Sequence, residues 1–181
     1  MIQNERDIRH ENVLQIAHQM MTAARTAPKG KGIDIVEVAL VTDEDLKILS
    51  DQMVAMAEEL GMKFFLRDAG NILNAECVVL IGTREEPLGL NCGHCGFATC
   101  LQRSEGVPCA INSVDVGIAI GSACATAADN RVDTRVMFSA GFAAQRLNWL
   151  KDCRQVFAIP VSASSKNPFF DRKPPKEQPK N

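Results

Sequence analysis

The sequence lacks a surplus of either charge. Its 181 residues include 20 lysines and arginines against 22 aspartates and glutamates, a formal net charge of −2. Binding of nucleic acid or of an anionic membrane surface calls for a basic patch, so we expect neither partner. The chain also lacks an apolar run long enough to cross a bilayer. Residues 1–20 carry charges throughout and lack the apolar segment of a signal peptide, so we expect a cytoplasmic location.

Histidine is scarce. The chain has three, and neither a Ser-His-Asp arrangement nor a His-Glu-x-x-His motif is present. Acid–base catalysis by histidine therefore has few candidates. Cysteine is abundant by comparison, with seven residues. An odd number of cysteines in a chain without an export signal favours metal or redox use over a disulfide framework.

Three cysteines gather in the segment Asn91–Cys100, where Cys92, Cys95 and Cys100 are separated by two and then four residues. A fourth, Cys109, follows after eight more. Glycines come directly after Cys92 and Cys95, and glycine allows a tight turn whose N–H groups point inward toward negative charge. A tight pair plus a third nearby thiolate is typical of iron–sulfur ligand sets. We expect the four cysteines to hold a 4Fe-4S cluster.

Other interpretations of this segment stay open. Structural zinc also uses paired cysteines, although it usually meets a second tight pair. A redox dithiol would need only Cys92 and Cys95. The cysteines could also be buried free thiols, which is how we interpret Cys77, Cys124 and Cys153. His94 is expected to be a solvated loop residue, with ligation a minor option.

A basic segment, 25–32, places Arg25, Lys29 and Lys31 beside Gly30 and Gly32. It predicts either a helix end, which cations and glycine favour, or an anion-binding loop for a phosphate-bearing cofactor. The polar segment 162–167, which contains Lys166, could bind phosphate in the same way or be a surface turn.

The pattern of apolar residues predicts an α+β domain over residues 1–171, with the cysteine-rich loop 84–112 as an insertion and a disordered tail over 172–181. Asp68 is expected to cap a short helix, Asp115 to be a cap or a solvated turn, and Pro160 to put the end of the last strand at a sheet edge. The expected helices cover 5–27, 44–60, 68–76, one or two turns in 97–105, 113–128 and 139–150, and the expected strands 33–41, 77–82, 132–138 and 156–161.

The motif Asn-Cys-Gly-x-Cys-Gly-x3-Cys at 91–100 resembles the four-iron segment of the corrinoid iron–sulfur protein and of ferredoxin-like subunits of membrane electron-transport complexes. Their last cysteine follows after a longer gap than the one before Cys109. The whole chain before the tail resembles a prokaryotic family described as ferredoxin-domain-containing and of unknown function. The segments that carry this likeness are Ala23–Asp34, Arg67–Ile72, Asn91–Cys100, Pro108-Cys109, Val114–Ala123, Val132–Gly141 and Ile159–Arg172.

A more distant resemblance is to flavin-dependent nitroreductases. The residues that carry it are Ala23–Pro28 and Asp115–Ala119, while the Arg-x-Ser-x-Arg phosphate signature of those enzymes is absent. The resemblance implies a nitroreductase-like mixed sheet flanked by helices, in an intertwined homodimer with FMN at its interface. It also places the flavin phosphate at the segment of Arg25, Lys29 and Lys31.

Together these observations predict an iron–sulfur redox protein, in which FMN and a 4Fe-4S cluster exchange electrons with a redox partner protein or a small-molecule acceptor. The alternative is an electron carrier or cluster-bearing binding module without flavin. No catalytic residue is assigned, and whether the chain is an enzyme stays open at this point.

Overall fold

The computed structural model describes residues 2–170, so the tail expected to be disordered, 172–181, lies outside the described residues. The elements in chain order are α1 (Glu5–Thr26), the 3-10 turn η1 (Gly30–Gly32), β1 (Val36–Val41), α2 (Glu44–Leu60), α3 (Phe64–Ile72), β2 (Cys77–Arg84), the 3-10 turn η2 (Cys100–Gln102), α4 (Ala110–Asp129), β3 (Asp133–Thr134), α5 (Phe138–Arg146) and β4 (Cys153–Ser162). The α+β class is therefore confirmed.

The strands form one sheet in the order β1-β2-β4-β3. Every pairing in the described part of the chain is antiparallel, where a mixed sheet was expected. The apolar run at 77–82 forms β2, an inner strand, as its continuous hydrophobicity indicates.

Pro160 does not end β4 at an edge but lies within it, opposite Val78. Ala158, two residues earlier, exchanges both backbone hydrogen bonds with Met137, so Pro160 faces that same side of the strand. There the pairing is interrupted between Thr134 and Met137, and a residue without an N–H costs no ladder bond.

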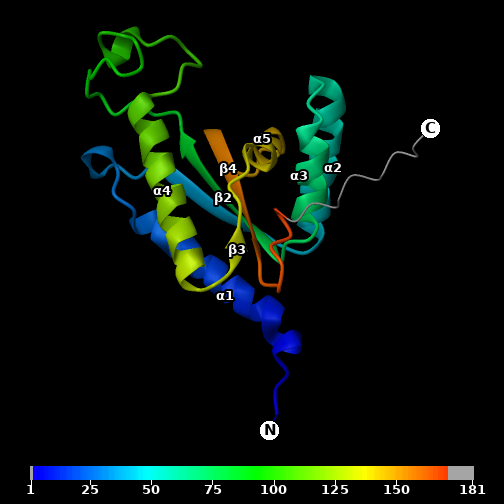
Figure 1. Ribbon diagram of the computed structural model, residues 1–181. Coiled ribbons are helices and arrows are strands. Elements are labelled where there is room, and N and C mark those ends of the chain that lie inside the picture. Colours follow the sequence, from blue (N-terminus) through cyan, green and yellow to red (C-terminus); the bar gives the residue numbers. More distant parts are fainter. Residues whose placement is uncertain (1, 171–181) are drawn as a thin grey trace, which may run out of the picture.

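Helices cover both faces of the sheet (Figure 1). On one face α1 and α4 pack along each other over Val79 and Ile81 of β2. On the other face α2, α3 and α5 pack over Val78 and Leu80. The alternation of β2 side chains between the two clusters is the two-residue period of a strand buried on both sides.

Local signals explain most helix boundaries. The side chain of Asn4 accepts a hydrogen bond from the Arg6 N–H and so caps α1. Gly61 ends α2 in the left-handed conformation that glycine adopts without strain, as expected. The third helix differs from its prediction. It begins at Phe64, so Asp68 is not a cap but a buried side chain in mid-helix, bonded to Ser139 at 2.6 Å.

The helix α4 contains an apolar face that the fold leaves uncovered. Val114, Gly117, Ile118, Gly121 and Ala125 are exposed at successive helical turns, while Val116, Ala119 and Ala123 are buried against the rest of the fold. Within the described residues, α4 is the helix whose length and composition would suit a membrane span, a test that core helices of soluble proteins pass as well.

Candidate metal centre

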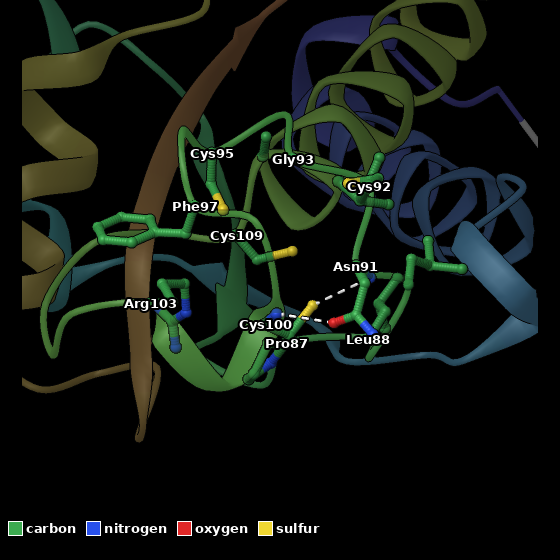
Figure 2. A pocket seen from close by; sticks show the side chains of 13 residues that line it. Pro87, Leu88, Asn91, Cys92, Gly93, Cys95, Phe97, Cys100, Arg103 and Cys109 are labelled. Carbon is green, nitrogen blue, oxygen red and sulfur yellow. Dashed lines mark hydrogen bonds between the residues drawn. The ribbon is translucent and has the colours of Figure 1, made fainter.

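The cysteine loop joins the end of β2 to the start of α4 and stands beyond one end of the sheet (Figure 1). All four candidate ligands, Cys92, Cys95, Cys100 and Cys109, line one pocket in this loop. Figure 2 shows the sulfur atoms of Cys95, Cys100 and Cys109 pointing into the space that the loop encloses. Apart from Asn91 and Arg103, the other side chains of the lining are apolar or absent, so thiolates are the metal ligands that this pocket offers.

The loop is closed in this conformation. The space between its side chains measures about 10 Å³, room for about one water-sized sphere. Across residues 2–170, nowhere are three or more potential ligands of the Cys, His, Asp and Glu types close enough to hold a metal ion. The four cysteines thus suit a cluster as ligands, whereas the space inside the closed loop is too small to hold one.

The backbone around the first two cysteines bends as the glycines predict. Gly93 and Gly96 have φ angles of 73° and 89°, in the region that side chains with a Cβ rarely adopt. The Gly96 N–H donates to the Gly93 carbonyl at 2.9 Å, which closes the turn between Cys92 and Cys95. This turn carries both thiols on a few residues of backbone.

Asn91 joins the two ends of the motif. Its backbone N–H donates to the Cys100 sulfur at 3.4 Å, and its side-chain oxygen accepts from the Cys100 N–H at 2.8 Å (Figure 2). An N–H donor at this sulfur would stabilise negative charge on a ligating Cys100. His94 instead turns to the backbone, with Nδ1 at 3.0 Å from the Cys92 carbonyl, and lies exposed at the surface.

Cys109 is the N-cap residue of α4 and is buried. Its carbonyl accepts from the Ser113 N–H at 3.1 Å, so its backbone belongs to the first turn of α4. The N-terminal end of a helix carries partial positive charge, which stabilises a bound anion near it. Although only eight residues separate Cys100 from Cys109, Cys109 lines the same pocket as the other three cysteines.

Arg103 was missed by the sequence analysis. It lines the pocket with the cysteines, and its Nη1 donates to Glu85 at 3.1 Å. A single arginine in a predicted helical turn gives no local signal of such a role, because the contact depends on how the loop closes.

The remaining cysteines lie elsewhere. Burial raises the pKa of Cys77 to about 12 and, with the nearby Glu37 charge, that of Cys153 to about 11. Burial also raises the pKa of Cys124, which is half-buried in α4. These three thiols stay protonated at neutral pH, as befits packing residues.

The basic segment 25–32 lies at the same end of the sheet as the cysteine loop, and its cations have partners within the chain. Lys29 directs its ammonium at the carbonyls of Ala24 and Arg25, the last turn of α1, and its side chain is buried. Lys31 donates to the carbonyl of Leu88, a residue of the cysteine pocket, at 3.0 Å.

Arg25 donates to Asp34 at 2.8 Å and to the Val36 carbonyl at 2.6 Å, with 47% of its side chain exposed. Burial alone would raise the pKa of Asp34, but the hydrogen bond and charge of Arg25 outweigh it and hold that pKa below its ordinary value. Arg25 thus anchors the segment while about half of its side chain stays accessible.

Lys166 does not lie near the basic segment 25–32. Val36 pairs with Thr83 at one end of β2, whereas Cys77 pairs with Val161, just before the loop of Lys166, at the other. The six residue-to-residue steps from Cys77 to Thr83 span roughly 20 Å of strand. Within one chain, one phosphate group cannot contact both Lys166 and Arg25, so the four expected cofactor residues do not form one site in a single chain.

Asp115 is neither a cap nor solvated. It is buried, and both of its carboxylate oxygens lie 3.0 Å from the Gly30 N–H. This bond ties the basic segment to α4 at a position six residues after Cys109.

Comparisons with known proteins place the chain among proteins without an assigned activity. The family described as "Uncharacterized protein containing a ferredoxin domain (DUF2148)" matches residues 105–172, a stretch that includes Cys109 and begins after Cys100. An uncharacterized protein of Archaeoglobus fulgidus is 38% identical over 186 residues, which cover 97% of this chain and 100% of that protein.

Among solved structures, similar folds occur in flavoproteins. A nitroreductase with bound FMN from Desulfitobacterium hafniense has a TM-score of 0.59 at 15% identity, covering 84% of this chain and 78% of that one. A BluB-like flavoprotein from Clostridium difficile has a TM-score of 0.56 at 17% identity, covering 91% and 85%. This confirms the expected nitroreductase-like fold.

Proposed function

Since the chain belongs to the family of uncharacterized proteins that contain a ferredoxin domain, we propose that it is an iron–sulfur redox protein. The family description and the flavoprotein fold support a redox role. The finer proposal is that Cys92, Cys95, Cys100 and Cys109 hold a 4Fe-4S cluster. When bound, such a cluster supplies one-electron transfer.

The observation that carries this proposal is the convergence of the four cysteines on one pocket. Three groups of the chain at this pocket stabilise negative charge. The Asn91 N–H contacts the Cys100 sulfur, the first turn of α4 holds Cys109, and the Arg103 guanidinium lines the wall. A cluster with four thiolates is anionic, so these donors stabilise it.

Binding of the cluster requires the loop to open, because the closed pocket has room for little more than one water. The segment that would move is exposed over most of Asn91–Ala98 and contains the two glycines with positive φ. β2 and α4, which hold its two ends, are built into the core and would stay in place.

We extend the proposal to FMN, which the similar nitroreductase binds. Arg25 and Lys31 would hold the flavin phosphate, since both side chains are exposed and Lys31 contacts Leu88 of the cysteine loop. Lys29 would support the segment by capping α1 rather than by touching the phosphate. A site here lies next to the cluster loop, which suits electron exchange between the two groups.

The alternative function is an electron carrier without flavin. It is favoured by the same basic segment, because each of its three cations already has a partner in the chain. An electron carrier needs the cluster and a docking partner but no phosphate site. The two functions therefore share the metal centre and differ in the flavin.

The test of the proposed function is metal and sulfide analysis of protein purified without oxygen. We expect about four iron and four sulfide per chain, and loss of the cluster when Cys92 or Cys109 is replaced by serine. The matched control is Cys77→Ser, because Cys77 is buried in the sheet far from the loop. Zinc in place of iron, or full loading of Cys109→Ser, would contradict the four-cysteine cluster. Flavin absorption bands in the same sample decide between the enzyme and the carrier.

A further inference from the structure

Arg103 is a nearly buried cation in the wall of the cysteine pocket, with 11% of its side chain exposed. Its Nη1 donates to Oε1 of Glu85 at 3.1 Å, and Oε2 of the same carboxylate accepts from Nε of Arg154 at 3.1 Å. One carboxylate thus serves two guanidinium groups. The charge of Arg103 is therefore only partly balanced by Glu85, and Arg103 is among the residues that line the pocket.

The Nε atom of Arg103 is buried and has no hydrogen-bond partner within residues 2–170. A buried donor left without an acceptor costs free energy, and the great majority of such groups in native proteins are paired. Glu85 fixes the far end of the guanidinium, so the group cannot turn outward to reach water. The acceptor that completes this hydrogen bond is therefore expected on the pocket side.

We infer that Arg103 donates its Nε–H to the iron–sulfur cluster, either to a cluster sulfide or to a ligating cysteine sulfur, and thereby sets the reduction potential. The inference rests on the proposed function, because it needs the cluster. Figure 2 shows Arg103 below Phe97, at the edge of the group of residues that line the pocket. Of the described arginines, Arg103 is the one that lines this pocket.

The sign of the effect follows from charge. Reduction adds one electron to an anionic group, and a cation in contact with that group stabilises the reduced form more than the oxidised form. Hydrogen bonds to the sulfur atoms act in the same direction. Arg103 therefore raises the reduction potential of the cluster.

The experiment compares anaerobic wild type with Arg103→Gln, Arg103→Lys and Arg154→Gln in a dithionite titration followed by electron paramagnetic resonance. Dithionite supplies the electron. We expect Arg103→Gln to weaken reduction at least tenfold, which is about 59 mV for one electron. Arg103→Lys keeps the charge and should shift the potential less. Arg154→Gln is the matched control, because Arg154 pairs with the same carboxylate but is 62% exposed and does not line the pocket.

A second measurement keeps the inference testable if a variant binds the cluster incompletely. Electron–nuclear double resonance on the reduced wild type should show an exchangeable proton coupled to the cluster in addition to that of the Asn91 N–H at the Cys100 sulfur, and Arg103→Leu should lack this additional signal. An equal shift in Arg103→Gln and Arg154→Gln, or the same exchangeable protons in Arg103→Leu as in wild type, would overturn the inference and leave the cluster intact. Wild type without iron would overturn the proposed function and this inference with it.

Discussion

At the scale of single residues, Gly141 decides how closely α5 approaches the sheet. A Cβ at this position would lie 2.2 Å from the Val156 carbonyl oxygen and 2.5 Å from the Phe157 Cα. Both contacts are with the backbone of β4, which cannot rotate away as a side chain can. The absence of a side chain here lets α5 pack directly on its strand.

We predict that Gly141→Ala destabilises the protein by at least about 1–3 kcal/mol, the usual cost of forcing an extra methyl group into a packed core. Gly70→Ala is the matched control, since Gly70 is exposed in α3 with nothing within 4 Å of its Cβ position. It should stabilise the protein by about 0.5–1 kcal/mol, because alanine favours a helix over glycine. Urea unfolding of both variants checks the pair, and equal stability of the two would show that α5 can move outward freely.

At the scale of elements, the segment between α1 and β1 is held by α4. Gly30 donates its N–H to Asp115, and a Cβ on Gly30 would lie 2.7 Å from side-chain atoms of both Ile111 and Leu88. Leu88 and Ile111 also line the cysteine pocket. The basic segment, the start of α4 and the cysteine loop therefore form one packed junction.

Replacing Asp115 by alanine should cost about 1–3 kcal/mol of unfolding free energy, because the Gly30 N–H would lose its acceptor in a part-buried place. Asp115→Asn keeps one side-chain oxygen and should cost less. Thermal unfolding of the two variants measures the difference. If asparagine and alanine are equally destabilising, the charge of Asp115 matters more than its hydrogen bond.

The same segment yields a test of flavin binding. If Arg25 holds the FMN phosphate, Arg25→Ala should weaken binding by about 1.5–3 kcal/mol, or roughly ten- to over a hundredfold. Asp34→Asn should tighten binding, because it frees the guanidinium from its 2.8 Å partner. Lys29→Ala should leave FMN affinity unchanged and lower the stability of the protein, since its ammonium caps α1.

Fluorescence titration of flavin-free protein with FMN measures all three variants. An Arg25→Ala variant that binds like wild type would remove Arg25 from the flavin site. Wild type that does not bind FMN at all would favour the electron carrier.

At the scale of the whole molecule, the uncovered face of α4 suggests self-association. Val114 and Ile118 are 54% and 40% exposed, one turn apart, and the glycines and alanine beside them would allow a second helix to approach closely. Exposed apolar faces of this kind usually mark an interface, and symmetric dimers are the commonest assembly. We propose a homodimer in which α4 meets α4 of a second copy.

Ile118→Glu should convert the dimer to monomer at micromolar concentration, because a carboxylate would have to be buried in the interface without a partner. Ile48→Glu is the control, as Ile48 is 48% exposed on α2, on the opposite face of the sheet. Light scattering coupled to gel filtration gives the masses. Wild type that runs as a monomer, or a monomeric Ile48→Glu, would contradict the α4 interface.

Much of the fold could be predicted from the sequence because its signals are local. The helical period of residues 5–27, the glycine after Leu60 and the apolar run that became β2 each depend on neighbours a few residues away. Pro160 and Asp68 were placed wrongly for the opposite reason. The conformation of each depends on a partner strand or helix that is distant in the chain.

For the candidate site, the spacing of Cys92, Cys95, Cys100 and Cys109 by itself indicated which residues are candidates to share a metal, because cysteines separated by short turns are confined to one part of the chain. Only the tertiary structure decided the surroundings. The register of β2 separates Lys166 from Arg25, the end of α1 takes the ammonium of Lys29, and closure of the loop turns Arg103 toward the cysteines. A charge acts on whatever lies within a few ångströms, and which groups those are is set by packing across the chain rather than by the order of residues along it.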